Sequence, residues 1–169
     1  MPNDELVRRL ANSVRLFAEF TADEIRQVLN YCKRASFDIG DYIVHQGEPG
    51  RSMYVLLAGQ VEVVRMIGDH EQVLSKLGPG DSFGELALLD YSERTASVRC
   101  LAPTVMLTFE RKALYQLPFV APKLYRNMAL LMASRLRETD ELVTELVERL
   151  DQAPDLAHRA TKAKRFIIG

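Results

Sequence analysis

The stretch FGELALLDYSERTASV, residues 83–98, combines a turn glycine, a short helical run and two charged side chains. Gly84 removes the side chain at a turn, and the run from Glu85 to Leu89 is typical of a short helix. The start of a helix presents unpaired N–H groups and a partial positive charge, so it favours an anion. Across the polar loop, Arg94 offers a planar fork that grips two phosphate oxygens. Because Glu85 offers acceptor-only oxygens that suit a sugar hydroxyl, the stretch predicts a site for a small molecule with a phosphate and a sugar.

These residues resemble the phosphate-binding cassette of cyclic nucleotide-binding domains. The family includes the regulatory subunits of cyclic-nucleotide-dependent kinases, cyclic-nucleotide-gated channels and the catabolite activator protein. The positions that match its pattern are Phe83, Gly84, Glu85, Ala87, Arg94, Ala96, Ser97 and Val98. A second signature lies upstream in IVHQGEPGRSMYVLLAGQVEV, residues 43–63, with glycines at 47, 50 and 59. The likeness covers approximately residues 14–150.

The resemblance implies a role for each side chain of the cassette. Arg94 is expected to pair with the cyclic phosphate, and Glu85 to accept a hydrogen bond from the ribose 2′-hydroxyl. Backbone amides near four residues are expected to complete the phosphate cradle: Gly84, Leu86, Ala87 and Thr95. The alternative is an ordinary surface ion pair between Glu85 and Arg94, which stabilises a protein little.

Upstream and downstream of the cassette, short apolar runs alternate with Gly and Pro, which indicates an antiparallel β architecture. Strands are predicted at 34–39, 42–45, 53–58, 60–66, 72–77, 95–100 and 104–110. The predicted fold class is α+β, with an antiparallel β jelly-roll barrel over residues 34–110. From their positions in the family pattern, Val63 and Leu77 are candidates for the apolar wall under the purine. Plain core positions are the alternative for both.

Helices are predicted on both sides of the barrel. Residues 3–31 read as short helices, and Thr21 with Glu24 forms a capping box. Residues 111–150 are also helical, with a break or bend expected around Pro122. An apolar heptad seam in this segment predicts a homodimer through the helix 129–150. Its members are Ala129, Met132, Leu136, Thr139, Val143, Leu146 and Leu150. The resemblance, together with these helices, implies that residues 1–150 form one cyclic nucleotide-binding domain.

The resemblance also implies base contacts on the long helix. Thr139 matches a threonine that touches the adenine amino group in the catabolite activator protein, and Arg135 matches an arginine that channel proteins place against the base. A threonine that merely interrupts the seam and a solvated arginine are the alternatives. Thr95 matches a threonine that favours cyclic GMP in kinase domains, whereas Thr139 favours cyclic AMP. Cyclic AMP is the expected ligand, with cyclic GMP as the alternative.

Composition argues against catalysis, metal binding and secretion. The three histidines, His45, His70 and His158, are widely spaced, and neither a G-x-S-x-G elbow nor a P-loop occurs. No enzyme activity, metal or cofactor is therefore expected beyond the nucleotide ligand. The net charge is −1, and the two cysteines suit a reducing compartment. Without an apolar signal core or a membrane span, the predicted location is the cytoplasm.

Residues 151–169 form a short basic tail. The tail is too short for a helix-turn-helix, so no DNA-binding module is expected. The sequence thus predicts a cyclic nucleotide receptor that signals to an unknown effector protein by movement of its C-terminal helices. The alternative is a structural adaptor whose cyclic nucleotide-binding fold is degenerate and unliganded.

Overall fold

The computed structural model describes residues 4–90 and 92–151 of the chain. The chain divides into two compact units, residues 1–128 and 129–169, and each is described separately. The first unit begins with α1 (Asp4–Ser13), a 3-10 turn η1 (Arg15–Phe17) and α2 (Ala22–Leu29). Eight strands follow: β1 (Cys32–Phe37), β2 (Tyr42–Val44), β3 (Ser52–Ala58), β4 (Val61–Ile67), β5 (His70–Leu77), β6 (Ser82–Phe83), β7 (Ser97–Cys100) and β8 (Thr104–Glu110). The short helix α3 (Leu86–Leu89) lies between β6 and β7, and η2 (Arg111–Gln116) precedes the long helix α4 (Ala121–Asp151).

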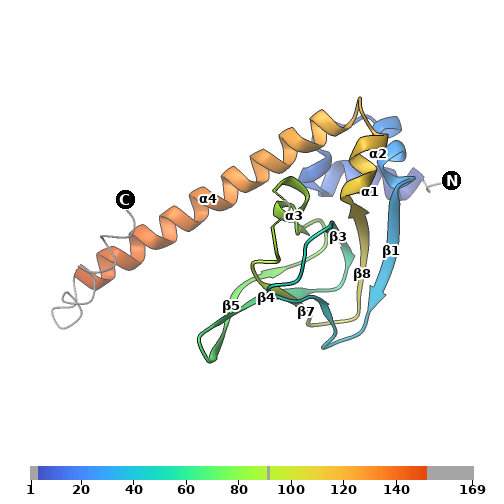
Figure 1. The fold of residues 1–169 in the computed structure, drawn as a ribbon. Coiled ribbons are helices and arrows are strands. Elements are labelled where there is room, and N and C mark those ends of the chain that lie inside the picture. Colours follow the sequence, from blue (N-terminus) through green and yellow to red (C-terminus); the bar gives the residue numbers. More distant parts are fainter. Residues whose placement is uncertain (1–3, 91, 152–169) are drawn as a thin grey trace. The chain divides into compact units, whose positions relative to one another are not determined.

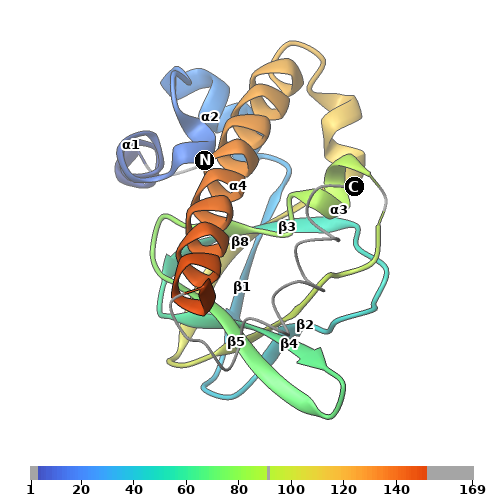
Figure 2. The same ribbon diagram turned by 90° about the vertical axis from the view of Figure 1, so that its left-hand side faces the viewer.

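The strands form two antiparallel sheets of four, in the orders β1-β8-β3-β6 and β2-β7-β4-β5. Strands distant in sequence are neighbours in both sheets, as in a jelly roll. One apolar cluster joins side chains of both sheets: Val44, Leu56, Val61, Phe83, Val98, Cys100 and Met106. The predicted fold class is confirmed, and the expected barrel takes the form of two sheets that share this core. The β4–β5 hairpin lies at the opposite end of the first unit from α1 and α2 (Figures 1 and 2).

The other face of the first sheet is also covered. Val55, Leu107 and Phe109 alternate with the inward-facing residues of β3 and β8, and they are only 3%, 6% and 4% exposed. On the helical side, α1 and α2 lie side by side (Figures 1 and 2). Arg9 of α1 donates a hydrogen bond to the backbone carbonyl of Leu57 in β3. The N-terminal helices are therefore part of the folded unit.

The capping box predicted at the start of α2 is confirmed. The Thr21 hydroxyl accepts a hydrogen bond from the Glu24 amide at 3.2 Å, and the Glu24 carboxylate accepts one from the Thr21 amide at 2.7 Å. Thr21 stands at the N-cap with extended backbone, where its side chain satisfies a donor that the helix leaves unpaired. The capping box could be predicted from the sequence because its contacts join residues that are only three positions apart.

The first turns of α4 are tied to the N-terminal segment by polar contacts. The buried Asn127 side chain donates hydrogen bonds to the carbonyls of Leu16 and Ala18, both at 2.8 Å. Lys123 contacts both carboxylate oxygens of Glu24 at 2.8 Å. These contacts join segments about a hundred residues apart in sequence, and they are all made within the first unit.

The boundaries of some elements differ from the prediction. The break expected around Pro122 lies just before it, because η2 ends at Gln116 and α4 begins at Ala121, from which the helix runs without interruption to Asp151. Pro122 thus stands in the first helical turn, where its missing N–H has no intrahelical partner to lose. The two-residue strand β6 was not predicted, since it is too short to show an alternating pattern.

The described part of the second unit is the helix over residues 129–151. Leu136 and Leu146 of the predicted seam are 63% and 57% exposed there. Residues 152–169, which include almost all of the predicted basic tail, lie outside the described residues. Among the described helices, none is both long enough and apolar enough to cross a membrane.

Candidate functional site

The cassette is built on strand β6 and the turn that follows it. Phe83 pairs with Tyr54 of β3, and Ser82 pairs with Val55. Gly84 then adopts a positive φ of 82°, a conformation that L side chains rarely adopt. A Cβ atom at this position would lie 2.5 Å from Nη1 of Arg94 and 3.0 Å from the Ser52 carbonyl oxygen. Glycine at position 84 therefore allows the close approach of the Arg94 side chain.

The upstream glycine signature fixes the backbone of Arg94. The Arg94 amide donates to the Glu48 carbonyl at 2.8 Å, and the Gly47 amide donates to the Arg94 carbonyl at 2.9 Å. The Gly50 amide donates to the Ser92 carbonyl at 3.3 Å, so the two segments pair at a third point. The two signatures, far apart in sequence, are thus adjacent in space. Gly47 and Gly50 act through their backbone amides in this turn.

The guanidinium of Arg94 is directed toward neutral groups. Nη2 donates to the Ser52 carbonyl at 2.6 Å, and Nη1 lies 3.5 Å from the Gly84 carbonyl. The residue is only 9% exposed, and burial lowers the pKa of its guanidinium. Within residues 4–90 and 92–151, no carboxylate forms an ion pair with it. Its hydrogen bonds end on neutral carbonyls, and the Glu48 and Glu85 carboxylates attract the charge without forming an ion pair with it. An incoming anion would add a directly bonded charged partner for the guanidinium.

The guanidinium of Arg94 lies over a pair of stacked aromatic rings, Tyr54 and Phe83. The guanidinium carbon lies 5.7 Å from the centre of the Tyr54 ring, and this ring stacks on Phe83 at 4.9 Å with an angle of 17° between the planes. Burial raises the pKa of the Tyr54 hydroxyl, and the Arg94 charge opposes that shift. A cation over an aromatic face is held by the ring quadrupole. Sequence analysis missed Tyr54, since it reads as one apolar position of a strand.

Glu85 is buried at the base of α3. Its carboxylate oxygen Oε1 accepts a hydrogen bond from the Ser82 hydroxyl at 2.6 Å, and the two residues are 3% and 4% exposed. The alternative of an ordinary surface ion pair between Glu85 and Arg94 does not hold, because both residues are buried and Arg94 donates to the Ser52 carbonyl. Burial of the Glu85 carboxylate and the Arg94 guanidinium in one cassette is costly, and buried charged groups of this kind cluster at binding sites.

The remaining candidates are distributed over several elements. Leu86 and Ala87 open α3, and Thr95 lies exposed just after Arg94. Val63 and Leu77 are partly buried and pack against the core cluster between the sheets. Arg135 and Thr139 belong to the second unit, where the Thr139 hydroxyl donates to the Arg135 carbonyl at 2.9 Å. The ligand contacts expected of all these residues stay predictions.

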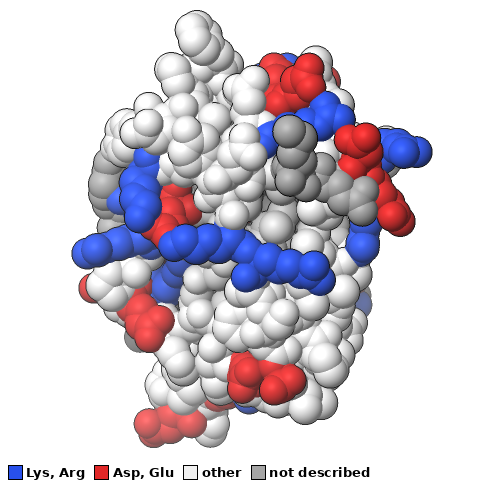
Figure 3. Space-filling view, turned by 90° about the vertical axis from the view of Figure 1, so that its right-hand side faces the viewer, with Lys and Arg blue, Asp and Glu red and all other residues white. Residues whose placement is uncertain are grey.

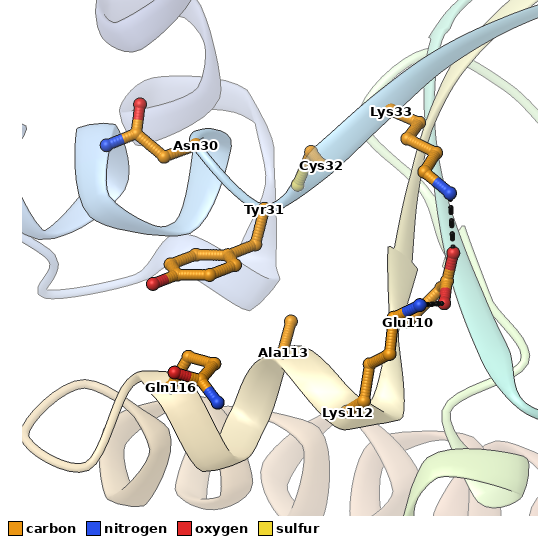
Figure 4. A pocket seen from close by; sticks show the side chains of 8 residues that line it. All are labelled: Asn30, Tyr31, Cys32, Lys33, Glu110, Lys112, Ala113 and Gln116. Carbon is orange, nitrogen blue, oxygen red and sulfur yellow. Dashed lines mark hydrogen bonds and ion pairs between the residues drawn. The ribbon is translucent and has the colours of Figure 1, made fainter.

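A separate cavity of about 390 Å³ lies between the end of α2, the start of β1 and η2 (Figure 4). Its lining is Asn30, Tyr31, Cys32, Lys33, Glu110, Lys112, Ala113 and Gln116. Lys33 and Lys112 both contact Glu110 at 2.8 Å, and these hydrogen bonds lower the pKa of Glu110 to about 2. Figure 3 shows basic side chains in a band across the face that carries β1. None of the predicted ligand-binding residues lines this cavity.

Among residues 4–90 and 92–151, no group of three or more His, Cys, Asp or Glu residues is placed to hold a metal ion. Cys32 and Cys100 are both free thiols, and burial raises the pKa of Cys32 to about 12. Such a thiol is protonated at neutral pH, so it is a poor nucleophile and a poor metal ligand.

Comparison with known proteins agrees with the geometry of the cassette. The sequence profile described as "Cyclic nucleotide-binding domain" matches residues 34–118. The "Cyclic AMP receptor protein" of Thermus thermophilus is 36% identical over 126 residues, which are 74% of this chain and 58% of that protein. A cyclic nucleotide-binding domain from Methylobacillus flagellatus has a similar structure, with a TM-score of 0.75, 27% identity, and coverage of 84% of this chain and 85% of that one.

Kinases also contain similar segments. The cGMP-dependent protein kinase egl-4 of Caenorhabditis briggsae is 36% identical over 109 residues, 63% of this chain but only 15% of the kinase. The chain spans about six-tenths of the length of its bacterial receptor relatives, 58% in one case and 63% in another. The likeness therefore concerns the nucleotide-binding part of these proteins.

Proposed function

Because the chain belongs to the cyclic nucleotide-binding domain family, we propose that it is a non-catalytic receptor for cyclic AMP that regulates another protein. The cyclic phosphate would bind at Arg94, and the ribose 2′-hydroxyl would donate to Glu85. Amides near Gly84, Leu86, Ala87 and Thr95 would complete the phosphate cradle, as the family pattern implies.

One observation carries the proposal. Arg94 is a buried cation whose hydrogen bonds end on neutral carbonyls and whose ring neighbour, Tyr54, adds no full charge of its own. A phosphate that replaces solvent at this guanidinium gains a charge-assisted contact, and its planar fork suits two phosphate oxygens. Glu85, buried within the same cassette, supplies the acceptor that distinguishes a ribose from a deoxyribose.

Cyclic AMP is favoured over cyclic GMP on two grounds. A bacterial relative that is 36% identical over 126 residues is named for cyclic AMP. Thr139 matches the threonine with which the catabolite activator protein contacts adenine. Thr95 and the likeness to a cGMP-dependent kinase keep cyclic GMP as the alternative. Val63 and Leu77 would form the apolar wall under the base, and Arg135 would contact its edge.

The signal would pass through the C-terminal helix. Nucleotide binding can shift the helix between two positions only if the ligand has different affinities for them, with a coupling of roughly 1–3 kcal/mol. The effector would be a protein that distinguishes the two positions. A cytoplasmic location and the absence of catalysis belong to the same proposal.

Pairing of two chains through the heptad seam is a further part of the proposal. Leu136 and Leu146 are 63% and 57% exposed, and association of two such helices would bury them. We expect the mass of a dimer in light scattering at tens of micromolar protein, and a shift toward the monomer in the double variant Leu136→Glu, Leu146→Glu. A monomer mass for the unaltered protein, with and without cyclic AMP, would contradict the pairing.

Ligand-induced stabilisation tests the receptor function itself. A nucleotide that binds only the folded protein, at 100 times its Kd, stabilises it by about 2.7 kcal/mol, which corresponds to a rise in Tm of roughly 5–10 °C. We expect this shift with cyclic AMP and none with 5′-AMP, whose phosphate is not cyclic. Unchanged Tm values with both cyclic AMP and cyclic GMP would favour the structural adaptor.

A further inference from the structure

Ser82 and Glu85 form a buried hydrogen-bonded pair inside the cassette. The Ser82 hydroxyl donates to Glu85 Oε1 at 2.6 Å, a short distance that is typical of a bond to a charged acceptor. The side chains belong to residues that are only 4% and 3% exposed. A carboxylate out of contact with bulk water depends on such donors, and each donor also limits the orientations that the carboxylate can adopt.

The backbone that carries the Ser82 hydroxyl is held by the sheet. Ser82 pairs with Val55 of β3, and the next residue, Phe83, pairs with Tyr54 and stacks on its ring at 4.9 Å. A glutamate side chain has several rotatable bonds, and its ordering costs conformational entropy. The short strand β6 therefore presents a fixed donor to a side chain that would otherwise sample several rotamers.

We propose that Ser82 is a positioning residue that orients the Glu85 carboxylate for recognition of the ribose 2′-hydroxyl. This inference rests on the proposed function, since it concerns the same site. A carboxylate accepts about four hydrogen bonds, so a bond from Ser82 leaves capacity for a ligand hydroxyl. By fixing the orientation of the Glu85 carboxylate, Ser82 determines where its remaining lone pairs point, and it does so without touching the nucleotide. The selectivity for ribose over deoxyribose then depends on a residue outside the ligand contacts.

The test is a comparison of two ligands by isothermal titration calorimetry with Ser82→Ala and the unaltered full chain. Cyclic AMP carries the 2′-hydroxyl, whereas 2′-deoxy cyclic AMP does not. A hydrogen bond to a charged group changes affinity by roughly tenfold or more, so the unaltered protein is expected to prefer cyclic AMP by about that factor. In Ser82→Ala we expect most of this preference to disappear, with the affinity for 2′-deoxy cyclic AMP unchanged within about twofold.

Two variants make the comparison specific. Ser82→Thr keeps the hydroxyl and should restore the preference, whereas Ser36→Ala, at an exposed position of β1, should leave it unaltered. If Ser82→Ala does not fold by circular dichroism, Ser82→Cys replaces it with a weak donor of similar size. A general structural role predicts equal losses for both ligands.

The outcomes separate this inference from the proposed function. If the unaltered protein binds cyclic AMP and Ser82→Ala keeps its ribose preference within twofold, the role of Ser82 is wrong and the receptor function stands. If both ligands weaken equally, Ser82 is structural and the inference is again wrong. If the unaltered protein binds neither cyclic AMP nor cyclic GMP, the proposed function fails and this inference fails with it.

Discussion

Replacing Arg94 with Leu is expected to weaken cyclic AMP binding by about 2–5 kcal/mol, because the phosphate loses its charged partner in a confined site. The guanidinium is 9% exposed and sits between the Ser52 carbonyl and the Tyr54 ring. A leucine fills part of this space but offers no donor. The dissociation constant from isothermal titration calorimetry measures the loss directly.

The fold of the Arg94 variant provides the control. Arg94→Leu removes a buried charge but leaves the Ser52 carbonyl without its donor. We therefore expect a folded Arg94→Leu protein whose free energy of unfolding falls by about 1–3 kcal/mol. Arg94→Lys should bind with intermediate affinity, because it keeps the charge and loses the fork. Affinity of Arg94→Leu close to that of the unaltered protein would remove Arg94 from the site.

Gly84→Ala is expected to damage both the fold and the site. The positive φ of 82° costs an L-residue roughly 1–2 kcal/mol, and the new methyl group would lie 2.5 Å from Arg94 Nη1. The guanidinium is the end of a flexible side chain, so it yields more easily than the Ser52 carbonyl, which would be 3.0 Å away. Displacement of Arg94 should lower cyclic AMP affinity by more than tenfold, by analogy with other lost charged hydrogen bonds worth roughly 1.5–3 kcal/mol.

Gly78→Ala is a matched control for this substitution. A Cβ at Gly78 meets no atom within 4 Å, and the residue does not have a positive φ. Its stability should change by less than about 0.5 kcal/mol, and its affinity for cyclic AMP should not change. Chemical denaturation gives the free energy of unfolding for both variants, and calorimetry gives their affinities. Equal behaviour of the two alanine variants would show that the Gly84 turn does not set the position of Arg94.

The sequence was sufficient to predict the parts of the protein that depend on local patterns. The capping box at Thr21, the positions of most strands and the glycine turn at position 84 follow from residue types at fixed spacings. The fold class could be predicted because short strands between Gly and Pro residues, with helices outside them, leave few alternatives. The family cassette adds Glu85 and Arg94, whose burial a local pattern alone does not reveal.

Contacts between distant strands were not predictable in the same way. Tyr54 supports Arg94 only because β3 pairs with β6, and Ser82 reaches Glu85 only because Gly84 turns the chain back. A break near Pro122 was expected, but its place depends on where α4 begins, which the proline alone does not determine. These features depend on contacts between segments that are distant in the sequence, and the spacing of apolar residues does not reveal such contacts.

A crystal structure of the protein grown with cyclic AMP tests the central claim most directly. We expect one nucleotide per chain, with Arg94 nitrogens within about 3 Å of two phosphate oxygens and a Glu85 oxygen within hydrogen-bond distance of the 2′-hydroxyl. Electron density for the nucleotide at another place, with Arg94 still bonded only to the Ser52 and Gly84 carbonyls, would contradict it.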